Sequence, residues 1–148
     1  LHTIPGLAIT IREMKVHGKN YAADITCNAQ ALGSALDTAG VPVEAKEFGF
    51  TKSHQIAINV SSFGPGKEIA RRLAESNIIS NYNMLPGDHD PRNPSGLRIG
   101  VQEMTRCGMG PEQMGELAEL MTAVIVKQKS VTNEVVKLRS HFSEVLYC

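Results

Sequence analysis

The chain has little of what marks several common protein classes. Only three cysteines occur among its 148 residues, at wide spacing and without a Cys-x-x-Cys pair. That pattern fits neither a disulfide framework nor a structural zinc site, and it favours a reducing, cytoplasmic setting. No apolar run approaches the ~18 residues that span a bilayer, and the N-terminus lacks the order of a signal peptide. We therefore expect a soluble cytoplasmic protein that makes no use of a membrane.

Net charge and metal-binding motifs are also missing. Lysine plus arginine (15) balances aspartate plus glutamate (15), so no overall field attracts nucleic acid. The five histidines form no HExxH or comparable pairing, which argues against a metal site. His54, beside a predicted strand, receives no role because a hydrogen-bonded histidine at a strand end is the commoner case. Residues 64–67 lack the spacing of a phosphate-binding loop, and Cys107 has only neighbouring Arg106 as a cue for a reactive thiol.

Hydrophobic periodicity predicts helices around a small sheet. Apolar residues at helical spacing predict helices over 5–18 and 21–36, unless the two form one long helix. The other predicted elements are strands at 41–43, 56–60, 78–84 and 97–100, and helices at 67–76, from residue 111 onward and over 131–145. This order predicts an α+β fold in which a small antiparallel sheet packs against helices. The length fits one domain, 1–148, and because the chain begins at Leu1 rather than methionine we expect a fragment of a longer polypeptide.

Arg98 is the most informative single residue. It sits between apolar neighbours on a predicted strand, directly after a loop rich in proline and glycine. A guanidinium offers a planar fork of donors that matches a carboxylate in two parallel hydrogen bonds. A structural ion pair with Asp88, Asp90 or Glu103 is the alternative, and on spacing alone it is favoured by about two to one.

Several motifs together resemble those of serine (glycine) hydroxymethyltransferases. The segment Ser95-Gly96-Leu97-Arg98-Ile99-Gly100, followed by Thr105-Arg106-Cys107-Gly108-Met109, resembles the family's Ser-Gly-[Ile/Leu]-Arg-[Ile/Leu]-Gly…Thr-x-x-Gly signature. Residues 2–7, 49–55, 81–86 and 90–94 resemble it as well, so most of the chain is involved. The resemblance implies the small C-terminal domain of a fold-type-I enzyme, a pyridoxal-phosphate protein with the aspartate-aminotransferase type of fold.

The resemblance also implies roles for individual residues. Arg98 would bind the α-carboxylate of serine or glycine and so orient the substrate, without transferring a proton. Asn83 would face the pterin of tetrahydrofolate or a related cosubstrate, with Asn93 and Pro94 as further folate-binding residues. The Schiff-base lysine and the cofactor's ring contacts belong to the family's large domain. We therefore expect no catalytic residue here, no activity of the chain alone, a partnership with its own large domain, and a homodimer at full length.

Two departures from the commoner bacterial pattern keep alternatives open. The strand of Arg98 continues as Gly100-Val101-Gln102-Glu103-Met104 instead of Gly-Thr-Pro-Ala, which is similar to the archaeal branch of the family. The loop runs from Pro94 directly into Ser95, without the Phe-Val-Thr that helps to shape the folate site. One rival is a pyridoxal-phosphate aldolase or transaldolase acting on threonine-like amino acids. Another is a stand-alone, non-catalytic binding module.

Overall fold

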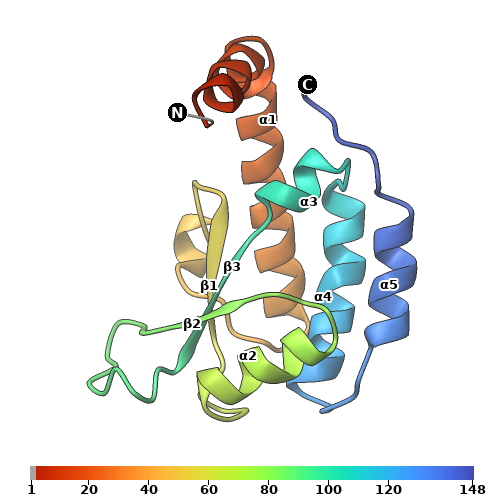
Figure 1. Cartoon of the computed structure of the whole chain (residues 1–148). Coiled ribbons are helices and arrows are strands. Elements are labelled where there is room, and N and C mark those ends of the chain that lie inside the picture. Colours follow the sequence, from red (N-terminus) through yellow and green to blue (C-terminus); the bar gives the residue numbers. More distant parts are fainter. Residues whose placement is uncertain (1–2) are drawn as a thin grey trace.

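The computed structural model describes residues 3–148, so the predicted motif residue His2 lies outside the described part. Along the chain the elements are α1 (Ile4–Thr38), η1 (Lys46–Phe48), β1 (Gln55–Asn59), α2 (Gly66–Glu75), β2 (Asn81–Asn83), β3 (Gly96–Gly100), α3 (Gln102–Arg106), α4 (Pro111–Ile125) and α5 (Thr132–Ser140). The sheet lies on one side of α1 and α4 and α5 lie on the other, while α2 runs across the lower end of the molecule from the sheet to α4 (Figure 1). The predicted α+β fold is confirmed.

Helix α1 is one continuous helix of 35 residues, with Gly18 inside it. Its second half belongs to the core: the buried residues are Ile25, Asn28, Ala29, Leu32, Gly33 and Leu36. Its first half rises beyond the rest of the molecule (Figure 1) and exposes large apolar side chains, Ile4, Leu7, Ile9, Ile11 and Val16. None of the helices in the described part combines the length and apolar character needed to cross a membrane.

The sheet has three antiparallel strands in the order β1-β3-β2. The last strand in sequence, β3, therefore lies in the middle, and α2 connects the two outer strands. Burial alternates along β1, where Ile56 and Ile58 point inward, and Leu97 and Ile99 do the same on β3. Period-two burial means that one sheet face packs against the helices while the other stays open.

A buried amide ties α1 to the segment that follows the sheet. The Asn28 Nδ2 group donates to Thr105 Oγ1 at 2.9 Å and to the carbonyl oxygen of Met109 at 2.8 Å. The C-terminal tail crosses the same region, where the Tyr147 hydroxyl donates to Asp24 Oδ2 at 2.6 Å. That bond to a carboxylate is the main reason why the pKa of Tyr147 rises to about 12. The end of the chain is thus anchored on the helix that enters the domain.

Three predicted element bounds are wrong because backbone groups are engaged elsewhere. The N–H of Ile78 closes the end of α2 by donating to Leu73, so β2 is limited to Asn81–Asn83 instead of 78–84. The predicted strand at 41–43 contributes only an isolated bridge, Val43 to Ile58. The last helix ends at Ser140 rather than 145, and the following tail bonds to α3 through the N–H of Leu146.

Candidate functional site

The outward side of the sheet is a polar surface, which we call the open face. Residues paired directly across antiparallel strands share one side of a sheet, and Arg98 pairs with Ala57 on β1 and with Asn81 on β2. The open face consists of Gln55, Ala57, Asn59, Asn81, Asn83, Gly96, Arg98 and Gly100. Arg98 is the only charged residue of the open face.

Arg98 stands at the centre of the open face among small neighbours. It is exposed, and Gly96 and Gly100 flank it on its own strand. Beside it on β1 is the methyl group of Ala57, and beside it on β2 is the amide of Asn81. The space beside both glycines is occupied, because a Cβ on Gly96 would lie 2.4 Å from Leu85 Cγ and one on Gly100 would lie 2.4 Å from Gln102 Oε1. The exposed guanidinium is therefore bordered by these two side chains along its own strand.

The alternative of a structural ion pair for Arg98 is wrong. Among residues 3–148 no carboxylate lies within ion-pair distance of Arg98, and two of the three proposed partners are engaged elsewhere. Asp88 accepts backbone N–H groups, and Asp90 pairs with Arg92 at 3.2 Å. An exposed guanidinium without an internal partner stays available to an anionic ligand.

Asn83 lies on the open face two residues from the level of Arg98. It pairs with Gly96 at the end of β2 and is exposed. Diagonal neighbours on paired strands are about 7–8 Å apart, which is within the span of a ligand that contacts both side chains. The sequence-based pairing of Arg98 with Asn83 at one site therefore corresponds to one surface of the fold, and the ligand role of each residue stays a prediction.

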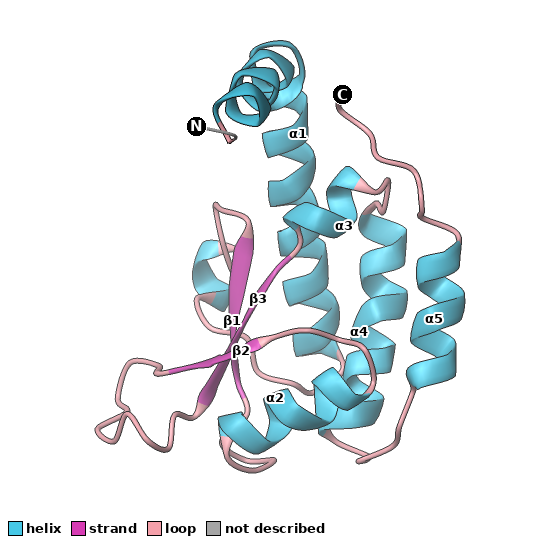
Figure 2. Ribbon diagram, in the orientation of Figure 1, coloured by secondary structure: helices cyan, strands magenta, loops and turns pink. Residues whose placement is uncertain are grey.

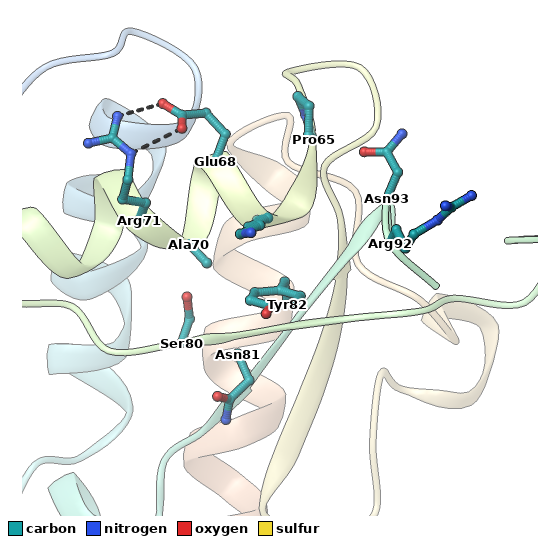
Figure 3. Close-up of a pocket in the computed structure, with 10 residues that line it drawn as sticks. Pro65, Glu68, Ala70, Arg71, Ser80, Asn81, Tyr82, Arg92 and Asn93 are labelled. Atoms are coloured by element: carbon teal, nitrogen blue, oxygen red, sulfur yellow. Dashed lines mark hydrogen bonds and ion pairs between the residues drawn. The ribbon is translucent and has the colours of Figure 1, made fainter. Parts of the chain in front are cut away.

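Asn93 and Pro94 lie in the loop between β2 and β3, which projects from the sheet (Figure 2). Asn93 is exposed and borders a cavity of about 500 Å³ between α2 and β2, together with Pro65, Tyr82 and Arg92 (Figure 3). Pro94 is buried, and its carbonyl oxygen accepts the Gly66 N–H at 3.1 Å. The folate-binding roles of both residues stay predictions. The side chain of Asn93 is exposed to the cavity, whereas Pro94 contributes through its carbonyl, which holds the loop against the start of α2.

The same loop is closed by a single carboxylate oxygen. Asp88 Oδ2 accepts the N–H of Leu85 at 2.9 Å and the N–H of Ser95 at 2.9 Å. These bonds, that from Ser95 first, hold the pKa of Asp88 below its ordinary value. Sequence reasoning treated Asp88 only as a possible ion-pair partner. Its position after Pro86-Gly87, a turn-forming pair, is a signal for backbone capping.

Glycines allow α2 and β3 to meet backbone to backbone. A Cβ on Gly66 would lie 2.7 Å from the carbonyl oxygen of Pro94 and 2.9 Å from that of Gly96. A Cβ on Gly96 would instead meet β2 and the loop after it, at 2.4 Å from Leu85 Cγ and 2.8 Å from the carbonyl oxygen of Asn83. Real Cβ atoms do not approach that closely, so both positions require glycine. The prediction of a helix start at residues 64–67 is confirmed, since α2 begins at Gly66.

The described residues do not fit a pyridoxal-phosphate cradle. Every lysine of residues 3–148 is exposed, whereas a lysine that holds this cofactor must lie in an enclosed site. Lys67 lines the cavity of Figure 3 but is also exposed. No group of three or more His, Cys, Asp or Glu side chains in the described residues is arranged for a metal ion. Cys107 is half-buried, with its Sγ 3.6 Å from Arg139 Nη2.

Comparisons with known proteins agree on one family. The family model described as serine hydroxymethyltransferase matches residues 1–121. A serine hydroxymethyltransferase of Methanocella arvoryzae is 46% identical over 153 residues, covering 100% of this chain and 36% of the relative. One from Saccharolobus islandicus is 49% identical, covering 99% and 35%. Among solved structures, L-threonine transaldolase from Pseudomonas fluorescens matches with a TM-score of 0.81 at 28% identity, covering 92% of this chain and 32% of that one.

The close approach at Gly66 predicts opposite effects for two glycine substitutions. Gly66→Ala should lower the free energy of unfolding by about 1–3 kcal/mol, because the new methyl group meets two carbonyl oxygens. Gly115→Ala, on α4 with nothing within 4 Å of the new Cβ, should raise it by about 0.5–1 kcal/mol. Urea unfolding measures both, and equal effects of the same sign would contradict the packing described here.

Proposed function

Because the chain belongs to the serine hydroxymethyltransferase family, we propose that its open face forms the carboxylate-binding part of an amino-acid site. In the whole polypeptide this site would serve the interconversion of serine and glycine, with one-carbon transfer to tetrahydrofolate or a related pterin. The chain spans about a third of the length of the curated relatives that it matches. The single observation that supports the proposal most is the exposed, unpaired Arg98 inside the family motif.

The proposed role of Arg98 is orientation. Two parallel hydrogen bonds from a guanidinium fix both the position and the rotation of a carboxylate, which a point charge does not do. Ala57 is a small neighbour of Arg98 on β1, and Asn81 on β2 adds an amide next to the guanidinium. With the carboxylate fixed, the bonds at the substrate's Cα take one orientation relative to the reacting groups.

The bond-breaking chemistry would come from outside this chain. Pyridoxal phosphate supplies an electron sink for carbanion chemistry at Cα when it is bound, and the described residues offer it no enclosed lysine. The family's large domain is the proposed source of that lysine, and residues 1–148 are the proposed small C-terminal domain. Dimerisation of the complete protein also belongs to this proposal.

The projecting half of α1 is the proposed contact with the large domain. Its exposed apolar residues form two stripes: Ile4, Leu7 and Ile11 on one side, and Ile9 and Val16 on the roughly opposite side. A helix that is apolar on more than one side is normally buried on those sides. About two thirds of the relatives' length lies outside the matched region, which supplies enough polypeptide to cover both stripes.

An aldolase or transaldolase for threonine-like amino acids is the second candidate. The observation in its favour is the structural match to a protein titled L-threonine transaldolase, at a TM-score of 0.81. The short loop after Pro94 points in the same direction. Both candidates need the same carboxylate clamp, so Arg98 does not separate them.

Arg98→Lys should raise the KM for serine and lower kcat/KM by about tenfold or more, because lysine cannot form the two-pronged contact. The measurement uses a chimera in which this chain replaces the aligned third of the Methanocella relative. Arg139→Lys is the control, because Arg139 lies on α5, on the side of α1 away from the sheet (Figure 1), where it bonds to the carbonyl of Phe142. Serine kinetics that do not change with Arg98→Lys would refute the clamp.

The two candidate reactions are separated by their need for a folate. In the same chimera we expect serine cleavage that depends on added tetrahydrofolate, because the one-carbon unit needs an acceptor. Release of an aldehyde from threonine at a higher rate, without any folate, would favour the aldolase or transaldolase reading. Purified chimera, both substrates and assays with and without the pterin suffice.

The proposed contact of α1 is tested by co-expressing this chain with the remaining part of the Methanocella relative as a separate polypeptide. Leu7→Glu with Ile9→Glu places a charge in each stripe and should weaken copurification by about tenfold or more. Val136→Glu on α5, at a similarly exposed apolar residue, is the control. Equal recovery of the complex with both variants would show that the stripes are not the contact.

A further inference from the structure

We propose that Asp88 is a positioning residue of the site, one that closes the loop between β2 and β3 and thereby sets Asn93 relative to Asn83. The inference rests on the proposed function for what the site binds, whereas the hydrogen bonds that close the loop do not depend on any assigned function. The Asp88 side chain makes no hydrogen bond to Arg98, Asn83 or Asn93, so its effect on them is transmitted by the backbone.

The geometry of Asp88 differs from that of an ordinary turn residue. One of its two bonds, to the N–H of Leu85, spans three residues and is local. The other, to the N–H of Ser95, spans seven residues and joins the two ends of the loop. Both bonds end on the same oxygen, Oδ2, so one atom holds the exit from β2 beside the entry into β3.

The atoms that Asp88 holds lie next to the predicted ligand residues in sequence. Leu85 follows Asn83 by two residues and is buried, whereas Ser95 follows Asn93 by two and precedes Arg98 by three. The carbonyl of Ser95 is also fixed, because it accepts the N–H of Val60 at 3.0 Å. The base of the loop is therefore held by hydrogen bonds on both sides. Asp88 is the side chain that links the segment after β2 to the segment before β3.

Other polar groups of the loop do not provide an equivalent link. Asp90 accepts the N–H and Nε of Arg92, two residues away, and so organises only the tip. His89 is exposed, and its side chain makes no hydrogen bond within residues 3–148. Without the Asp88 carboxylate, two backbone N–H groups at the loop base would lose their acceptor, which favours opening of the loop.

The first test uses the 148-residue chain and does not depend on any activity. Asp88→Ala should speed amide hydrogen exchange at Leu85 and Ser95 by about tenfold and should shift the NMR resonances of Asn83 and Asn93. Asp88→Asn, which keeps an oxygen acceptor at the same place, should restore most of the protection, and His89→Ala should leave it unchanged. Unchanged exchange and resonances in Asp88→Ala would overturn the proposal.

The second test asks whether the positioning matters for the cosubstrate. In the chimera, Asp88→Ala should raise the KM for tetrahydrofolate by about tenfold while kcat and the KM for serine change little, and Asp88→Asn should restore it. An unchanged KM for tetrahydrofolate, in a chimera whose Arg98 behaves as a clamp, would overturn the role of Asp88 and leave the proposed function intact. If the parent chimera cleaves no serine, the proposed function fails, and the exchange and NMR data alone decide whether Asp88 positions the loop.

Discussion

The candidate site depends on the direct contact between the start of α2 and the start of β3. The N–H of Gly66 bonds to the carbonyl of Pro94, and no side-chain atom fits at Gly66 or Gly96. Because helix and strand touch through their backbones, the loop from β2 must return to one fixed point. That return places β3 in the middle of the sheet and brings Arg98 into register with Asn81 and Ala57. The position of the exposed guanidinium between these two residues follows from this contact.

The fold class was predictable because it follows from side-chain patterns. Apolar residues on either side of Arg98 identified β3, and helical spacing identified α2 close to its observed bounds and α4 from its observed start. The errors came where backbone hydrogen bonds decide the outcome. Ile78 has the composition of a strand residue, but its N–H completes the end of α2. Periodicity reports which side chains are apolar and carries no information about which N–H group is already engaged.

The candidate site was predictable to a smaller extent, and from motif resemblance more than from spacing. Spacing alone favoured an ion pair for Arg98, because a sequence does not show that Asp88 is already held by two N–H groups. Conversely, Asp88 itself was overlooked as an organising residue, since its two acceptor bonds join positions seven residues apart in a loop without periodicity. Contacts of this kind arise from the return path of the chain, which only the three-dimensional arrangement reveals.

Helix α1 joins the sheet to the part of the molecule that projects from it. Its second half is locked into the core through Asn28, Leu32 and Leu36, and the Asn28 amide also holds the segment after β3 through Thr105 and Met109. The first half runs in a different direction from the second and leaves the core (Figure 1). The same core contacts therefore anchor both β3 and the helix that projects, so that a partner covering the projecting half would be attached to the strand of Arg98 through one buried amide.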